Sequence, residues 1–269
     1  TIDNPMALTV YYEGQEKDKY DTYFGAIKTT FVASDTFTLK FIGSLFHTLE
    51  QEHFDVLAQY RLGEVDSIIG SETYGDVGFT RGIGSELSHA RNDLDALIAN
   101  IELKGSYDWK KNKLEWGTKY TRESIRDRII EWEVIDSAGF SLNPPLVILP
   151  KNNQPYNSFS GPLAPYQSVI AINFNTINRF SGYTQWSLKS TIGSNEVWYN
   201  AGVRFHSWNV SGAVIDGKTQ AILSPRAQFS LKPDWEKDII FRLSGGLYSQ
   251  PPFYRELRDN EGIVQPNVK

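Results

Sequence analysis

The stretch Ala221–Leu257, AILSPRAQFSLKPDWEKDIIFRLSGGLYSQPPFYREL, contains two runs of alternating residues separated by a turn. Alternation with a period of two is the pattern of a β-strand, whose successive side chains point to opposite faces. The turn is Pro233–Lys237, so the two runs form a predicted β-hairpin. The apolar positions are Ala221, Leu223, Pro225, Ala227, Phe229 and Leu231, then Ile239, Phe241, Leu243, Gly245 and Leu247.

The other face of this hairpin carries Arg226, Lys232 and Arg242. Beyond it the chain enters a segment rich in proline and aromatic residues, Gln250–Glu256, instead of another tight turn. We therefore predict a hairpin of a membrane β-barrel, with one face towards lipid and the far end opening into a long loop.

The same residues resemble a known family. Ser224-Pro225-Arg226, the turn Lys232–Trp235, and Gly246-Leu247-Tyr248 leading into Gln250–Leu257 are similar to the barrel of TonB-dependent outer-membrane receptors of the type found in Bacteroidota. The resemblance is specific over residues 221–258 and is one of pattern only over residues 23–205. It implies an all-β, transmembrane antiparallel β-barrel of 22 strands, of which this chain would supply about eight. No plug domain and no TonB box can be matched to the sequence.

Composition leaves the class open. The 269 residues are 13% aromatic, with 14 Tyr and 7 Trp. The mean hydropathy is −0.38, and no apolar run approaches the roughly 18 to 20 residues of a membrane helix. Barrel strands expose only every second residue to lipid, so hydropathy alone does not decide between a soluble protein and a membrane barrel.

Charge and cysteine content exclude other classes. The net charge is −5, without the clustered basic face of a nucleic-acid-binding protein, so we expect no nucleic-acid partner. The absence of cysteine excludes disulfides and thiolate sites. The first residues, Thr1–Pro5, have no signal-peptide pattern, and the end is loop-like, so we expect an internal piece of a longer protein.

Three further hairpins follow from the alternation. Tyr23–Ala33 should pair with Phe37–Leu49 across a turn at 34–36, whereas residues 1–22 should be a loop with a short strand. The other two hairpins pair Leu97–Trp109 with Leu114–Tyr120 across 110–113, and Phe180–Leu188 with Val197–Phe205 across 191–196.

Between the hairpins lie long polar segments. We expect them near 50–93, 136–167, 207–220 and 250–269, within one receptor β-barrel domain covering 1–269. Connections in compact soluble domains are mostly about 4–6 residues. Bacterial barrels instead have short periplasmic turns and long extracellular loops, so these segments are predicted to lie outside the cell.

Several indoles fall at the rim with the short turns. Trp109 and Trp116 flank one turn and Trp235 lies in another, as in the aromatic girdle at a membrane boundary. A cross-strand aromatic pair in an ordinary sheet is the simpler alternative.

Few residues suggest chemistry. His47, Glu50, Glu52 and His53 have the ligand types of a zinc or iron site, but His47 and Glu50 should point to opposite faces of a strand. Arg81–Ser85 lacks the strand-to-helix frame of a nucleotide loop, Asn209–Ser211 matches a glycosylation acceptor that matters only in a eukaryotic secretory context, and no Gly-x-Ser-x-Gly elbow occurs. We expect no enzyme, catalytic residue, metal or cofactor, and ligand-binding residues stay unassigned.

The alternation also predicts which side chains face lipid. Outward positions are Ile101, Leu103, Trp186, Val203, Phe241 and Leu243. Inward charged positions are Glu102, Lys104, Asp108, Glu115, Lys119, Arg179, Lys189, Arg204, Arg226 and Arg242, most of which should pair with one another or with a plug.

The implied function is TonB-coupled import of a siderophore, cobalamin, glycan or peptide across the outer membrane of a Gram-negative cell. The implied partners are TonB, acting through a plug, an extracellular ligand, outer-membrane lipid and a possible surface lipoprotein. One alternative is a complete small porin-like barrel. Another is a soluble β-sandwich, either a binding module or a glycan-active enzyme, whose long loops would form the site.

Overall fold

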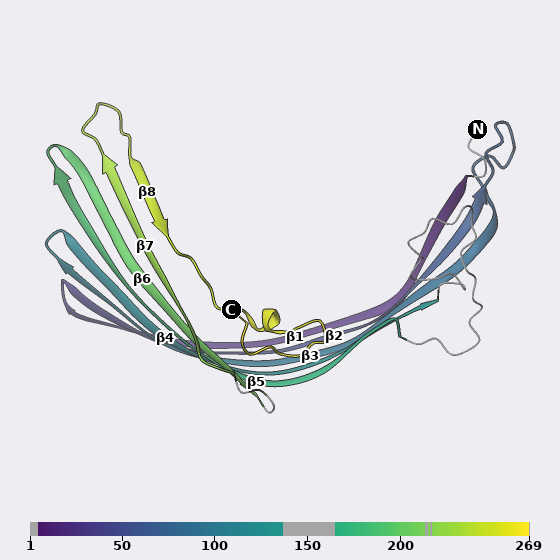
Figure 1. Cartoon of the computed structure of the whole chain (residues 1–269), viewed down its shortest axis with the longest axis horizontal. Helices are drawn as coiled ribbons and strands as arrows, with labels where there is room; N and C mark the ends of the chain where they lie inside the picture. Colours follow the sequence, from purple (N-terminus) through teal and green to yellow (C-terminus); the bar gives the residue numbers. More distant parts are fainter. Residues whose placement is uncertain (1–4, 137–164, 213–214, 216, 269) are drawn as a thin grey trace. The chain divides into compact units, whose positions relative to one another are not determined.

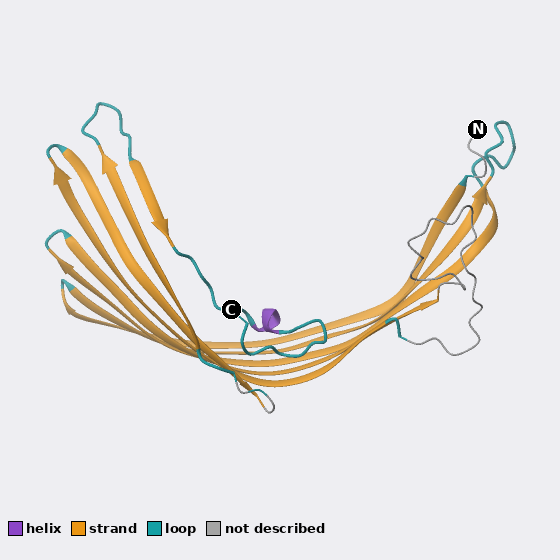
Figure 2. Ribbon diagram, in the orientation of Figure 1, coloured by secondary structure: helices purple, strands orange, loops and turns teal. Residues whose placement is uncertain are grey.

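The protein is a single antiparallel sheet of eight strands joined in chain order (Figures 1 and 2). The computed structural model describes residues 5–136, 165–212, 215 and 217–268. The predicted all-β, antiparallel architecture is confirmed, and the sheet is not closed, because β1 and β8 are its two edges. The elements are β1 (Met6–Ser34), β2 (Phe37–Val65), β3 (Val77–Trp109), β4 (Asn112–Asp136), β5 (Gln167–Ile192), β6 (Asn195–Gly212), β7 (Gln220–Lys232), β8 (Phe241–Gly246) and the short 3₁₀ helix η1 (Tyr254–Leu257).

The contacts divide the chain into two compact units. Unit 1 consists of Thr1–Lys19, Glu50–Asp93 and Arg128–Ala171, and unit 2 of Tyr20–Leu49, Leu94–Asp127 and Ile172–Lys269. Unit 2 therefore contains every short turn between successive strands, all of β6–β8 and the C-terminal segment.

The three tight turns predicted within residues 34–36, 110–113 and 191–196 are confirmed, each as two residues. Asp35-Thr36, Lys110-Lys111 and Gly193-Ser194 separate the paired strands. Two of these turns need the left-handed region of backbone conformation, which Gly193 adopts at φ 64° and Lys110 at φ 54°. Glycine reaches this region freely, while a lysine there is uncommon.

The register of β5–β8 confirms the predicted division of side chains between two faces. Trp186 lies opposite Ala201, Phe205 opposite Leu223, and Phe229 opposite Leu243. Directly opposed residues share a face, so these apolar side chains form one surface, which we call the apolar face. The polar face carries Arg179, Gln185, Asn200, Arg204, Arg226 and Arg242.

The long polar segment expected at 50–93 is wrong for most of its length. β2 continues to Val65 and β3 begins at Val77, so only residues 66–76 connect them. Residues 1–22 are likewise mostly strand, because β1 begins at Met6. On β1 the stretch 15–19 is polar on both faces. On β2 the positions Phe54, Val56, Ala58, Tyr60 and Leu62 continue an alternation beyond Leu49, where the prediction ended the strand.

The other long segments differ less. β6 extends to Gly212 and β7 starts at Gln220, so the segment expected at 207–220 is shorter than predicted. The segment expected at 136–167 fits the gap between β4 and β5, although residues 137–164 lie outside the described part of the chain. Residues after Gly246 contain η1 and no long strand, as expected for 250–269.

The buried core of unit 2 lies on the polar face, beneath the C-terminal segment. Leu257 and Val264 from this segment are 0% and 2% exposed and pack against buried Ile177, Trp208 and Val210. In Figure 1 the chain leaves β8 and returns across the sheet, with η1 over the strands. The apolar cluster on the polar face therefore lies beneath the C-terminal segment.

Candidate functional site

The apolar face of unit 2 exposes large apolar side chains to the surroundings. Leu243 is 73% exposed and Ile101 is 56% exposed. Side-chain contacts between strands show that β4 and β5 share this face, since Tyr120 donates to Asn178 over 2.8 Å and Trp186 donates to Asn112 over 3.0 Å. Other exposed members are Phe31, Phe41, Leu45, Leu103, Phe180, Trp186, Phe205 and Leu223.

On β1–β4 of unit 2 this apolar surface ends at a polar or charged residue. Going along each strand away from the short turns, the next residue on this face is Asp21 after Tyr23 on β1, His47 after Leu45 on β2, and Asp95 after Leu97 on β3. On β4 the change comes between Tyr120 and Arg122. On β5 the polar residues Asn178 and Thr176 follow Phe180, and exposed apolar side chains resume at Phe174. His47 belongs to the polar boundary, because its Nε2 lies 2.8 Å from Asp95 Oδ1.

Aromatic rings gather on this face near the short turns. Trp116 stacks on Phe37 with a centroid distance of 6.0 Å, and Tyr107 stacks on Trp109 at 5.5 Å. Trp116 reaches Phe37 across β3 because Gly105 has no side chain, and a Cβ there would lie 2.2 Å from Trp116 Cζ2. Trp235 makes a separate contact with Phe241 at 6.0 Å.

The polar face has polar and charged side chains, some of them buried. Asn100 donates to Ser44 over 3.2 Å and accepts from Thr121 over 2.7 Å, which links β2, β3 and β4. Arg179 pairs with Glu123 over 2.6 Å. Among the predicted inward charges, Lys104 also pairs with Glu102, and Lys189 with Glu196.

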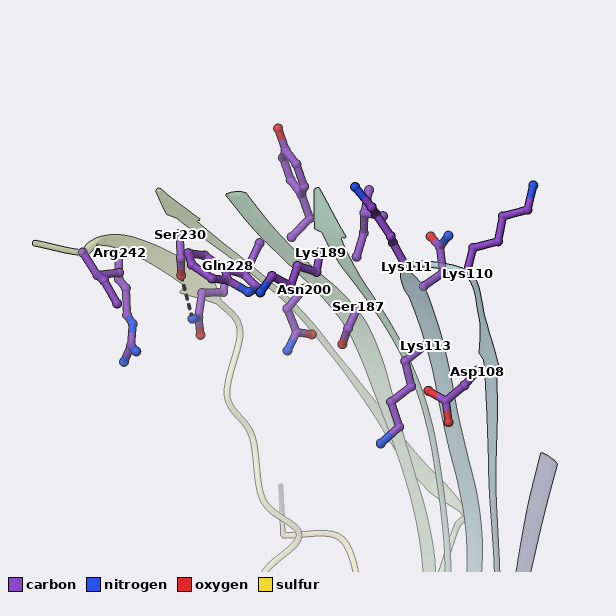
Figure 3. A pocket seen from close by; sticks show the side chains of 15 residues that line it. Asp108, Lys110, Lys111, Lys113, Ser187, Lys189, Asn200, Gln228, Ser230 and Arg242 are labelled. Atoms are coloured by element: carbon purple, nitrogen blue, oxygen red, sulfur yellow. Dashed lines mark hydrogen bonds between the residues drawn. The ribbon is translucent and has the colours of Figure 1, made fainter. Parts of the chain in front are cut away.

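A basic hollow of about 650 Å³ lies at the end of this face that is nearest the short turns (Figure 3). Asp108 and Lys113 lie on one side, Gln228, Ser230 and Arg242 on the other, with Asn200 and Ser187 between them. Two of its lysines are already engaged: Lys113 pairs with Glu115, and Lys189 lies 5.5 Å from the ring of Trp198. The hollow is cationic but partly neutralised.

The C-terminal segment is fixed to the polar face by a buried carboxylate. Asp127 on β4 is 7% exposed, and its Oδ2 accepts from the Tyr254 hydroxyl at 2.8 Å and from Arg258 at 3.0 Å. Burial, and then the Asp127 charge, raise the pKa of Tyr254 well above its usual range, so its hydroxyl stays a donor. Asn173 adds a hydrogen bond to the carbonyl of Gly262 over 2.8 Å.

A separate polar network occupies unit 1. Asp55 on β2 contacts His89 over 2.6 Å and Arg91 over 2.5 Å, and His89 stacks on Trp132 at 4.5 Å. His53 contacts Asp93 at 3.2 Å, and Arg128 also pairs with Asp93. Sequence reasoning missed this network because it treated residues 50–93 as a loop. Its signal was the alternation of charged and His residues at odd positions of β2 and β3.

The candidates from the sequence do not form one site. His47 and His53 contact different aspartates in different units, and Glu52 and His53 lie in β2, although we had expected a loop. No group of three metal-ligating side chains occurs among the described residues. Arg81–Ser85 belongs to β3, and Asn209 on β6 donates to the carbonyl of Gly217.

Comparisons with protein-family models, curated proteins and solved structures find no match for this chain. Within the described residues, no helix has the length and apolar character needed to cross a bilayer. The fold and the two contrasting faces of unit 2 therefore carry the functional argument.

Proposed function

We propose that this chain is part of the transmembrane β-barrel of a TonB-dependent receptor that imports a nutrient ligand across the outer membrane of a Gram-negative cell. The observation that carries the proposal is the chemistry of unit 2, where large apolar side chains are exposed on one face, while the other face carries charged and polar side chains and buries an apolar cluster beneath the C-terminal segment. A soluble sheet has the reverse arrangement, because burial of apolar area stabilises it in water.

The extent of the apolar face fits a bilayer. On β1–β3 it covers residues 23–33, 37–45 and 97–109. A membrane β-strand needs about 9–11 residues, with aromatic rings at both boundaries. The rings of Phe37, Tyr107, Trp109 and Trp116 would lie at the boundary near the short turns, and those of Tyr23 and Tyr120 at the other.

The edges of the sheet favour a larger barrel over either alternative. β1 and β8 do not pair with each other, as a complete eight-stranded porin-like barrel would require. The described strands form one sheet, whereas a β-sandwich needs two packed sheets. β1 is exposed along most of its 29 residues, and such an edge is a template for pairing with further strands.

Uptake measurements test the import function. Cells lacking this protein should lose uptake of one ligand class among ferric siderophores, cobalamin, glycans and peptides, and cells lacking TonB should lose the same uptake. A surface lipoprotein that assists capture should co-purify in detergent. The proposal would be refuted if cells lacking the protein took up all of these ligand classes normally. It would also be refuted if the uptake that depends on the protein persisted in cells lacking TonB.

Sidedness gives a second test. Because the short turns are proposed to be periplasmic, an impermeant maleimide on intact cells should label Ser71→Cys and should not label Lys111→Cys. Lys218→Cys, at an exposed position of the connection between β6 and β7, should be labelled as well. The opposite labelling pattern would invert the topology.

A further inference from the structure

We propose that a second hollow on the polar face of unit 2 binds an oxyanion, a carboxylate or phosphate group of a small ligand. This hollow has a volume of about 300 Å³ and is lined by Arg204, Ser224, Arg226 and the segment Leu247–Gln250. It lies where the chain leaves β8, the start of the return segment that is visible in Figure 1.

The register brings the two arginines together. Arg204 on β6 lies directly opposite Ser224 on β7, and Arg226 is two residues further along β7. Gly202 and Gly246 are the residues opposite Arg226 on its two neighbouring strands. Neither strand therefore places a side chain beside Arg226 on this face. A Cβ at Gly246 would lie 2.8 Å from the Cβ of Arg226, so only glycine fits there.

The charge of these arginines is not neutralised by the described residues. β5–β8 contain a single carboxylate, Glu196, which pairs with Lys189. Arg226 donates to the neutral Gln185 Oε1 at 2.8 Å, and no carboxylate in the described part of the chain lies within ion-pair distance of Arg204. A guanidinium has five N–H donors, so most of the donors remain available to a ligand.

Ser224 supplies an independent indication of a ligand. It is 7% exposed, and its Oγ is buried without a hydrogen-bond partner. A buried hydroxyl normally has a partner, and one that lacks it lowers stability. An oxyanion between the two guanidinium groups would accept from Ser224 as well, and the phenol of Tyr248 lines the same hollow.

The dimensions limit the ligand. Sites for small molecules generally measure about 300–1,000 Å³, so this hollow suits one anionic group of a ligand and not a large molecule as a whole. Arginine pairs are suited to carboxylate and phosphate because the planar fork offers two parallel N–H donors to two oxygens. The site would line the import path only if the proposed function holds, whereas binding itself does not require transport.

Calorimetric titration of the detergent-purified protein with inorganic phosphate and with citrate, at constant ionic strength, tests the site. We expect saturable binding of at least one anion and none of glucose. Arg204→Gln and Arg226→Gln should each weaken binding about tenfold or more, because each removes charge-assisted hydrogen bonds. Arg204→Lys, which keeps the charge but not the fork, should weaken it less, and Ser224→Ala should weaken it by a few-fold.

Lys40→Gln is the matched control, since it removes a cation from β2 outside the hollow and should leave binding unchanged. Preference for phosphate or for citrate identifies the group that the site takes. Absence of binding by both anions, or equal weakening by Lys40→Gln, would overturn the proposal. Equal weakening would show general charge attraction. The two proposals can fail separately. Anion binding by the purified protein without any effect of the protein on uptake would count against the import function alone, and uptake without anion binding would count against this site alone.

Discussion

Substitution of Asp127 by alanine should release the C-terminal segment from the sheet. Asp127 is the shared acceptor of Tyr254 and Arg258, and all three side chains belong to unit 2. Loss of the carboxylate leaves the Arg258 charge and the Tyr254 hydroxyl without this acceptor. The segment also contributes Leu257 and Val264 to the core, so its release exposes apolar surface.

The magnitude follows from burial. Removing one partner of a buried ion pair costs about 3–5 kcal/mol. Arg258 retains 22% exposure of its side chain, against 7% for Asp127, so solvent screening lowers the expected loss to about 2–4 kcal/mol. Exchange of the Gln265 amide, which donates to the carbonyl of Leu257 over 2.7 Å, reports local opening. Its hydrogen-exchange rate should rise about 30-fold or more in Asp127→Ala.

Glu115→Ala is the control, because the Lys113–Glu115 pair is 43% and 37% exposed and such pairs contribute about 1 kcal/mol or less. It should leave the exchange of Gln265 unchanged. A double variant, Asp127→Leu with Arg258→Leu, should be less destabilised than Asp127→Ala because no unpaired charge remains. An exchange rate in Asp127→Ala within about threefold of the control would refute this account of the segment.

Three further outcomes follow from the two units. Gly105→Val should displace Trp116 and destabilise the protein by about 1–3 kcal/mol, which should change the tryptophan fluorescence and lower the midpoint of unfolding. Gly43→Val should be tolerated, because no atom lies within 4 Å of the added Cβ. Equal effects of the two substitutions would contradict the role of Gly105. Leu103→Arg or Phe241→Arg should cost about 2–4 kcal/mol if the position lies near the bilayer midplane, measured by unfolding in lipid vesicles, with neutral effects at both counting against membrane contact. Hydrogen bonds from Ser71, then from the backbone of Ile68 and from Thr73, hold the pKa of Asp66 below its ordinary value of 3.8. The stabilisation from these bonds is therefore present above pH 3.8 and is lost as the pH falls through the lower folded-state pKa. Proteolysis of the 66–76 connection should increase in that acid range, and Asp66→Asn should abolish this pH dependence.

The connection predicted at 233–237 extends to residue 240, because β8 begins only at Phe241. The alternation around Phe180, Trp186, Phe205 and Leu243 was otherwise sufficient to predict the hairpins, their turns and the division of faces in unit 2. That success has a simple cause, since one face excludes polar residues over many positions and the strand period is two. The sequence prediction did not extend β2 and β3 through residues 50–65 and 77–93. Charged and histidine side chains are frequent there and obscured the strand period of Phe54, Val56, Ala58, Tyr60 and Leu62. Cross-strand contacts such as Asp55 with His89 stabilise the pairing.

The candidate sites were less predictable than the fold. Arg204 and Arg226 were predicted to face inward, but their proximity to Ser224 depends on the register between β6 and β7. The Asp127 cluster joins residues separated by 127 and 131 positions, a distance at which local patterns carry no information. The return of the C-terminal segment onto the sheet was not expected.

Spin-label accessibility along β3 tests the membrane proposal most directly. The chain contains no cysteine, so single cysteines at positions 93–105 can each carry a nitroxide label in vesicle-reconstituted protein. We predict that collisions with oxygen are frequent at Ile101 and Leu103 and rare at Glu102 and Lys104, that a water-soluble nickel complex shows the opposite pattern, and that the alternation ends at Asp95. A nickel complex that reaches Ile101 and Leu103 as readily as Asp95 would place this face in water and contradict the barrel.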